Sequence, residues 1–182
     1  HVTANTGWPA GQLSELEVYG PTTGEPGGNL AAGKPITASS TVHTFIATNA
    51  NDGDVTTYWE GAGGAYPSTL TVALGANATI SSIVVRLNPD PVWSARTQTL
   101  SVQGREQSAG TFTTIAGSAT YGFIPSSGNT VTIPVSATAA DVRLTFTANS
   151  GAPNGQVAEL QVIGVAAPNP DLTVSGMSFS PA

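Results

Sequence analysis

The chain of 182 residues contains no cysteine, a single lysine and few charged residues of any kind. Without cysteine, disulfide bonds, thiolate metal sites and thiol nucleophiles are excluded. With 5 basic and 11 acidic side chains and no basic cluster, the sequence lacks the positive surface that binds phosphate backbones, so nucleic acid is not expected as a partner. The longest apolar runs have the length of strands, so no membrane association is expected either.

Residues suited to catalysis are also scarce. The chain has two histidines, one of them at the first position, and no serine lies in a Gly-x-Ser-x-Gly context. Among the carboxylates that could cleave a glycoside, Asp52 and Asp54 are better explained by a cation site, and Glu106 by a surface position. We therefore do not expect an enzyme.

What the sequence has in abundance is Thr, Ser, Ala, Gly and Val, a composition that favours strands and turns. Leu100 and Val102 alternate with polar neighbours, as in a sheet that turns one face to the core. The expected strands are 69–74, 81–87, 97–104, 130–135, 141–148 and 157–164. Their even spacing and the Gly- and Pro-bearing turns between them predict an all-β sandwich or barrel.

An internal repeat marks the domain organisation. Residues 1–20 align without a gap to residues 145–164, with eleven identical positions. Because an offset of this size is that of a whole domain, we interpret residues 1–20 as the C-terminal strand of a preceding homologous repeat. In this strand Leu13, Leu16 and Val18 are expected to cover apolar surface or to pair with another strand, while Glu15 is expected to bind nothing.

The Gly- and Pro-rich residues 21–28 are then predicted to be a linker, and residues 29–164 one complete module. Residues 165–182 are predicted to hold a linker and the first strand of a following module. The alternation that starts at Leu172 resembles the start of immunoglobulin-like adhesion repeats.

Three segments carry a more specific resemblance. NLAAGKPITASS at 29–40, NANDGDVTTYWEG at 49–61 and ELQVIG at 159–164 occur in an order that resembles the discoidin or coagulation factor V/VIII C-terminal type of domain. Bacterial domains of this type are galactose-binding-like carbohydrate-binding modules. The resemblance implies an antiparallel jelly-roll β-sandwich, usually an appendage of a secreted glycoside hydrolase. Ala73 lies where members often have an aspartate, so any contact of that aspartate is lost.

A cation site is expected near Asp52 and Asp54, which flank a glycine. Carboxylate, carbonyl and hydroxyl oxygens are the ligands of hard cations such as calcium, although the same residues also suit a tight turn without metal. The resemblance implies a structural calcium, with Glu159 of the last strand closing the site. The implied ligands, carbonyls at Asn49 and Ala158 included, are Asn49, Asp52, Asp54, Thr57, Ala158 and Glu159.

A sugar site needs an apolar platform for the C–H face of the ring and a few convergent hydrogen-bonding groups. Trp93, in a polar loop, is the strongest candidate for the platform. Arg96 suits two adjacent hydroxyls, with pairing to Asp90 as the alternative, and His43 is also consistent with an ordinary loop histidine. Trp59 is expected in the core. The predicted sugar-binding residues are Trp93, Arg96, His43, Glu60 and Tyr58.

These patterns predict a secreted, noncatalytic carbohydrate-binding module that targets a polysaccharide-degrading enzyme to its glycan. The hydroxyl-rich site favours a neutral glucan or a galactose-type sugar, with α-linked or β-1,3-linked glucan as the first expectation. The expected partners are this polysaccharide and neighbouring modules of the same chain. The alternative is an adhesion or spacer domain that binds protein or a cell surface without recognising sugar.

Overall fold

The computed structural model describes Gly7 and residues 27–167. Expectations that fall on residues 1–6, 8–26 and 168–182, including the N-terminal strand and the strand after Leu172, lie outside the described residues. The strands are β1 (Gly28–Asn29), β2 (Ile36–Ala38), β3 (Trp59–Glu60), β4 (Ser68–Arg86), β5 (Arg96–Arg105), β6 (Thr113–Phe123), β7 (Thr130–Asn149), β8 (Gln156–Val157) and β9 (Glu159–Ala166). Three 3-10 helical turns connect them, namely η1 (Ala47–Ala50), η2 (Pro91–Trp93) and η3 (Pro125–Ser127). Within the described ranges no helix is long and apolar enough to cross a bilayer.

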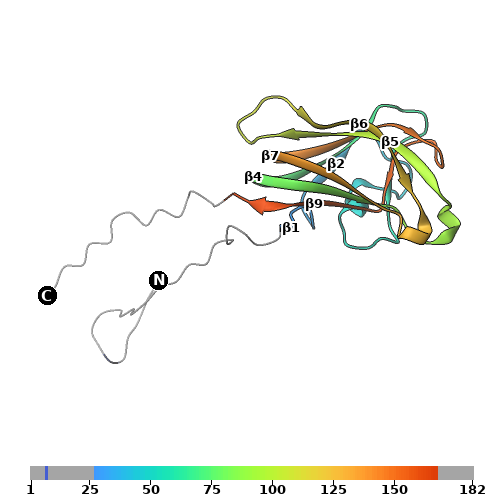
Figure 1. Cartoon of the computed structure of the whole chain (residues 1–182), viewed down its shortest axis with the longest axis horizontal. Coiled ribbons are helices and arrows are strands. Elements are labelled where there is room, and N and C mark those ends of the chain that lie inside the picture. Colours follow the sequence, from blue (N-terminus) through green and yellow to red (C-terminus); the bar gives the residue numbers. More distant parts are fainter. Residues whose placement is uncertain (1–6, 8–26, 168–182) are drawn as a thin grey trace.

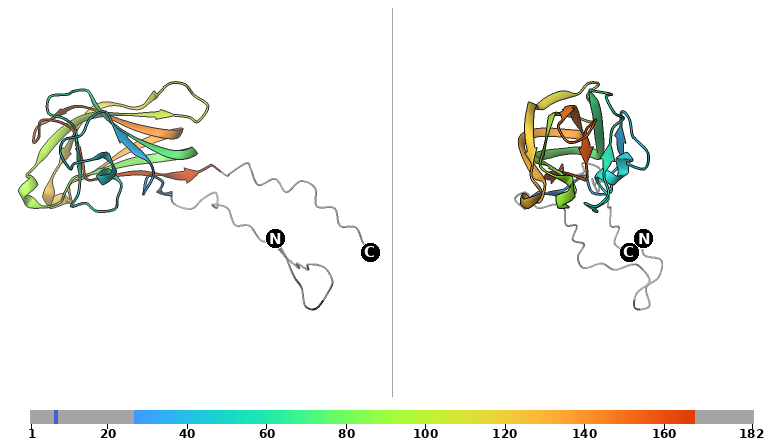
Figure 2. Two further views of the ribbon diagram at one scale, coloured as in Figure 1. Left: turned by 180° about the vertical axis from the view of Figure 1, so that it is seen from behind. Right: turned by 90° about the vertical axis from the view of Figure 1, so that its right-hand side faces the viewer.

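Two long strands, β4 and β7, organise the fold. They pair antiparallel along almost their whole length, with a break in register between Ala73 and Ala78. The second half of β4 also pairs with β9, whereas its first half pairs with β2. The second half of β7 continues to β5 and then to β6. Each long strand therefore contributes one half to each layer of an antiparallel sandwich, as the views in Figures 1 and 2 show, and the predicted fold class is confirmed.

The core between the layers follows from the period-2 alternation in the sequence. Residues pointing inward from β4, β5, β7 and β9 are buried, while their neighbours are partly or fully exposed. Burying each such side chain contributes roughly 1.5–3 kcal/mol. Trp59 is completely buried, as expected, with its ring centroid 5.6 Å from that of Phe146. The main core residues of these strands are Leu70, Val72, Ile80, Ile83, Val85, Leu100, Val102, Ile133, Leu144, Phe146, Leu160 and Val162.

The structure corrects the expected strands in two respects. The predicted strands 69–74 and 81–87 are halves of the single strand β4, and 130–135 and 141–148 are halves of β7. The turn-forming residues between the halves bend the ribbon instead of ending it, and Gly75 has a φ of 94°, a value that favours glycine. Strand β6 was not expected, because as the last strand in the sheet order it is mostly exposed and lacks the alternation of a buried strand.

Strands also extend into the edges of both predicted linkers. Gly28 belongs to β1 and pairs with Gly164, and β9 continues through Val165 and Ala166. The described chain thus begins and ends at one end of the sandwich, the end at which β4 and β7 bend (left in Figure 1).

Candidate functional site

Connecting segments gather at the opposite end of the sandwich, at the right in Figure 1. We call residues 42–60, 86–96, 124–129 and 149–159 the loop end. Three described residues other than glycine have a positive φ, and all three lie here: His43 (49°), Ser94 (50°) and Asn129 (48°). Such backbone conformations are uncommon and are concentrated at functional sites. The loop end is therefore the strongest candidate region for a binding site.

An aromatic cluster formed by Phe45, Tyr58 and Trp93 lies at the loop end. The rings of Phe45 and Tyr58 are stacked, with centroids 4.2 Å apart and an interplanar angle of 18°. Tyr58 meets Trp93 at a centroid distance of 4.7 Å and an angle of 89°. All three side chains are partly buried, and Trp93 also packs against the core. Two segments of the loop end, 42–60 and 86–96, thus contribute to one apolar surface.

Local hydrogen bonds fix the loop that carries Trp93. The side chain of Asn88 accepts from the backbone N–H of Asp90 (2.9 Å), and the side chain of Asp90 accepts from that of Val92 (2.9 Å). The N–H of Trp93 donates to the carbonyl of Asp90 (3.0 Å). These successive turns, in which an Asn or Asp side chain caps the backbone two residues on, explain why the polar residues precede the tryptophan. Asp90 is therefore the cap of η2.

A hydrogen-bonded chain runs from Arg96 through Gln156 to Glu60. Arg96 Nη1 donates to Gln156 Oε1 (2.8 Å), and Gln156 Nε2 donates to Glu60 Oε2 (2.8 Å). The guanidinium of Arg96 also lies 4.9 Å from the ring centroid of Trp93, and its Nη2 donates to the carbonyl of that residue. Arg96 thus has these partners rather than Asp90, and Gln156, which is 5% exposed, separates its charge from that of Glu60.

The charges at this site influence one another. Burial lowers the pKa of Arg96, while the nearby Glu60 and Tyr58 counteract that effect. Burial and then Glu60 raise the pKa of Tyr58, so its hydroxyl stays protonated at neutral pH. The site therefore combines a guanidinium, a phenolic hydroxyl and a carboxylate, which are the donors and acceptors that sugar hydroxyls can use.

Four of the five predicted sugar-binding residues, namely Tyr58, Glu60, Trp93 and Arg96, lie in this connected group. His43 is exposed at the tip of the turn from Val42 to Phe45, next to the group. Their role in sugar binding stays a prediction. Phe45 and Gln156 were not predicted as site residues. Each had a signal in the sequence, because Phe45 ends the loop stretch that contains His43, and Gln156 recurs in the internal repeat as Gln12.

The predicted calcium loop directly precedes Tyr58 in the chain. Asp52 accepts hydrogen bonds from the N–H of Asp54 (2.9 Å) and from the hydroxyl of Thr57 (2.7 Å). The N–H of Gly53 donates to Glu159 Oε2 (3.1 Å), which joins the loop to β9. Glu159 is 4% exposed, and its pKa is raised by burial and by Asp52, while Gly53 and Arg86 act in the opposite direction.

Other predicted ligands of the calcium loop have structural bonds of their own. Asp54 Oδ1 accepts from the N–H and the hydroxyl of Thr56, and the side-chain amide of Asn49 donates to the carbonyl of Tyr58 (3.1 Å). The N–H of Ala158 donates to the carbonyl of Arg86. Across Gly7 and residues 27–167, no three His, Asp or Glu side chains form a group suited to a metal ion. A cation here would therefore need carbonyl and hydroxyl ligands, and calcium stays a prediction.

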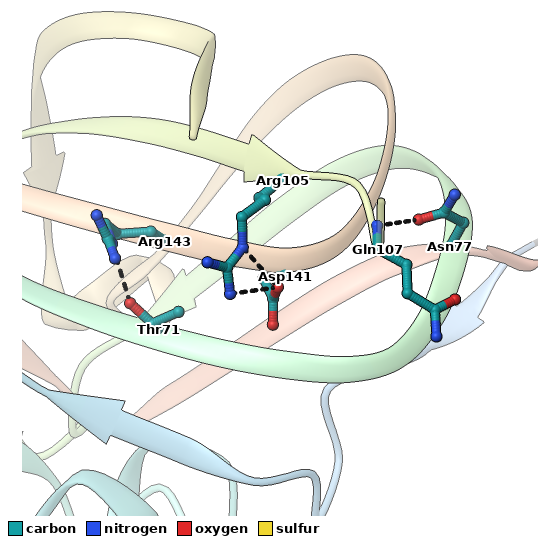
Figure 3. A network of polar contacts seen from close by, with 6 residues as sticks. All are labelled: Thr71, Asn77, Arg105, Gln107, Asp141 and Arg143. Atoms are coloured by element: carbon teal, nitrogen blue, oxygen red, sulfur yellow. Dashed lines mark hydrogen bonds and ion pairs between the residues drawn. The ribbon is translucent and has the colours of Figure 1, made fainter. Parts of the chain in front are cut away.

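The bend end, formed by residues 71–78, 105–113 and 139–143, is different in character. Arg105 forms an ion pair with Asp141 (2.9 Å), and Arg143 Nε donates to the hydroxyl of Thr71 (3.1 Å). The side chain of Asn77 accepts from the N–H of Gln107 (2.8 Å), which ties the β5–β6 loop to the bend of β4. Figure 3 shows these polar groups as three bonded pairs, which join β4 to β7, β5 to β7 and β4 to the β5–β6 loop.

A family model for the F5/8 type C domain matches residues 35–160, a span that includes the core, the aromatic cluster and the predicted calcium loop. The chain belongs to the F5/8 type C domain family. No curated protein sequence matches this F5/8 type C domain.

Carbohydrate-binding modules are among the solved structures similar to this F5/8 type C domain. Chitosan-binding module 1 of a chitosanase/glucanase from Paenibacillus sp. IK-5 has 25% identity and a TM-score of 0.61, covering 75% of this chain and 99% of the module. Chitosan-binding module 2 of the same enzyme, in complex with chitotriose, has 25% identity and a TM-score of 0.58, covering 75% of this chain and 100% of the module. The family 32 module of NanJ from C. perfringens, in complex with galactose, has 23% identity and a TM-score of 0.56, covering 70% and 91%. The last likeness concerns the fold alone.

Proposed function

We propose that this F5/8 type C domain is a noncatalytic carbohydrate-binding module that holds a secreted polysaccharide-degrading enzyme on its glycan. The observation that carries the proposal is the contact between the aromatic cluster and the chain of Arg96, Gln156 and Glu60 at the loop end. Aromatic rings stack on the C–H face of a pyranose, and adjacent polar groups bind its hydroxyls. The likeness to two chitosan-binding modules of a chitosanase/glucanase supports the same conclusion.

The charge of the loop end narrows the class of glycan. Its acidic residues are Asp52, Asp54, Glu60, Asp90 and Glu159, and its basic residues are Arg86 and Arg96. A surface with this excess of negative charge repels acidic polysaccharides. We therefore propose a neutral glucan or galactose-type glycan as the ligand, with chitosan, the polymer named for the two similar modules, as the cationic comparison.

A structural calcium is the second part of the proposal. Asp52, Thr57 and Glu159 approach one another around Gly53, and within the described part of the chain the buried Glu159 carboxylate accepts one hydrogen bond, from Gly53. A hard cation at this place would neutralise the two carboxylates and hold the loop against β9. Since Asn49 of the same loop bonds to the carbonyl of Tyr58, this would also steady the aromatic cluster.

Native gel electrophoresis in gels containing a single polysaccharide tests the binding function. A β-1,3-glucan, an α-glucan, a galactan, chitosan and alginate form the panel, and a protein without glycan affinity is the mobility reference. We expect one of the neutral glycans to retard the wild-type chain and alginate not to. No retardation by any glycan would contradict the proposal and favour the adhesion or spacer alternative.

The melting temperature tests the calcium proposal separately. Calcium is expected to raise the melting temperature of the wild type above its value in excess chelator and to leave that of Glu159→Gln unchanged. Equal wild-type melting temperatures in calcium and in chelator would contradict a structural calcium. The glycan-binding proposal would stand in that case.

A further inference from the structure

We infer that Phe45, rather than Trp93, carries the face on which the sugar ring stacks, and that Trp93 and Arg96 are positioning residues that support it. This inference rests on the proposed function and assigns roles within the same site. A platform must keep one ring face open to solvent, because a pyranose can stack only on aromatic surface that no protein group covers.

Trp93 has several of its surfaces occupied by protein. Tyr58 meets it at 4.7 Å in a T-shaped contact, and the guanidinium of Arg96 lies over its ring at 4.9 Å. The indole also packs against the hydrophobic core, a contact that the structure does not assign to Phe45 or Tyr58. Trp93 therefore resembles an anchor between the core and the cluster more than a free platform.

Phe45 lies at the outer end of the same series of contacts. Its ring partner is Tyr58, which stacks on it nearly parallel at 4.2 Å and so covers one of its faces. The neighbouring residues His43, Thr44 and Ile46 are exposed. Because Tyr58 covers one face of the ring, the second face of Phe45 is the one that a sugar could use.

The backbone around Phe45 is nevertheless held firmly. The N–H of Phe45 donates to the carbonyl of Val42 (3.0 Å), and its carbonyl accepts from the N–H of Glu60 (3.2 Å). A partly exposed ring on a fixed backbone can bind a sugar with little loss of conformational entropy. Because Glu60 is bonded directly to Phe45, its carboxylate oxygen Oε1, next to the one that Gln156 occupies, is suited to accept a sugar hydroxyl beside the platform.

Protein groups lie against Nη1, Nη2 and Nε of the Arg96 side chain. Nη1 donates to Gln156 and Nη2 to the carbonyl of Trp93, while Nε is buried without a partner. A β-carbon at Gly151 would lie 2.7 Å from Nε, so the backbone of Gly151 covers this third side. The guanidinium therefore holds Trp93 and Gln156 in place.

Dissociation constants from affinity gels, measured together with melting temperatures, test these roles. Phe45→Ala is expected to weaken binding at least about tenfold and to keep the wild-type melting temperature. Trp93→Phe, which keeps an aromatic anchor, is expected to stay within about threefold of the wild-type affinity. Ile124→Ala removes another exposed apolar side chain of the loop end and serves as the matched control.

A second variant distinguishes a loss of the binding surface from a loss of folding. Phe45→Trp is expected to keep binding and to show a change in tryptophan fluorescence on adding the glycan that is larger than that of the wild type. Wild-type affinity in Phe45→Ala, or loss of binding in a folded Phe45→Trp, would overturn the inference. A wild-type chain that binds no glycan would instead show that the proposed function is wrong.

Discussion

The two ends of the sandwich contain similar groups in different arrangements. At the loop end Arg96 lies over Trp93, and its hydrogen bonds continue through Gln156 to Glu60. At the bend end two arginines flank one ring, since the guanidinium groups of Arg105 and Arg143 lie 4.7 and 3.7 Å from the centroid of Phe112. A contact between arginine and an aromatic ring therefore does not by itself distinguish a binding site.

What differs is how the charges are satisfied. Arg105 is paired directly with Asp141, because its Nε and Nη2 both contact the carboxylate oxygen Oδ2. At the loop end a neutral amide, that of Gln156, separates the guanidinium of Arg96 from the carboxylate of Glu60. The bend end has a hollow of about 360 Å³, but its lining is mostly small side chains around the ion pair, without the stacked rings of the loop end: Ala73, Gly75, Arg105, Gln107, Ala109, Ala140 and Asp141.

The largest contrast between the ends is expected when each network is cut at its centre. Gln156→Ala removes the link between Arg96 and Glu60 and leaves the partly buried guanidinium with the carbonyl of Trp93 as its remaining acceptor among the described residues, which should lower the free energy of unfolding by about 1–3 kcal/mol. Glycan affinity should fall at least about tenfold. Denaturant unfolding and affinity gels measure the two effects.

Asp141→Asn is the matched control at the bend end. It removes the charge of a partly exposed ion pair, so unfolding should change by no more than about 1 kcal/mol and glycan affinity should stay as in the wild type. Weaker binding in this variant, at unchanged stability, would mean that the bend end takes part in recognition and that the contrast between the ends is wrong.

The fold was largely predictable from the sequence, because it depends on alternation that is local in the chain. The alternation of Leu100 and Val102 with polar residues predicts that both side chains face a core, whichever strands pack against them, and both are buried. The bends that unite the halves of β4 and β7 were not predictable, since turn-forming residues alone do not show whether the ribbon ends or only turns. Edge strand β6 was missed because it buries too little apolar surface to show a period.

The site was predictable only in part for a different reason. Trp93, Tyr58 and Glu60 were recognised by residue type and by their place in loops. Phe45 and Gln156 belong to the site through contacts between segments distant in sequence, and residue type gives no sign of those contacts. The internal repeat did carry a signal, because Gln156 and Gly151 recur as Gln12 and Gly7, but only the structure relates both positions to Arg96.

A smaller effect is expected from adding one methyl group beside Arg96. In Gly151→Ala the new β-carbon would lie 2.7 Å from Nε and 2.9 Å from Cδ and Cζ of Arg96, so the side chain of Arg96 must shift from the position in which it bonds to Gln156. We expect a loss of about 1–2 kcal/mol in unfolding and a loss of affinity of about threefold to tenfold.

Gly110→Ala is the control for this substitution in the β5–β6 loop of the bend end, where a β-carbon would meet no atom within 4 Å. It should leave the affinity unchanged and the stability unchanged or slightly higher, because alanine restricts the unfolded chain. If both alanine variants bind and unfold like the wild type, the guanidinium position is not what supports the cluster.

The smallest expected effect concerns the pH dependence of stability at Glu159. Because burial and Asp52 raise its pKa in the folded state, the stability that this group contributes is present below its unfolded pKa of about 4.3 and is lost as pH rises through the folded value. In excess chelator Glu159→Gln should therefore become more stable relative to the wild type between pH 4 and pH 7, by no more than about 1 kcal/mol. Melting curves of both proteins across that range measure the difference. A difference that does not vary with pH would show that the Glu159 carboxylate costs the fold nothing, and the buried charge would then give no reason to expect a cation at the loop end.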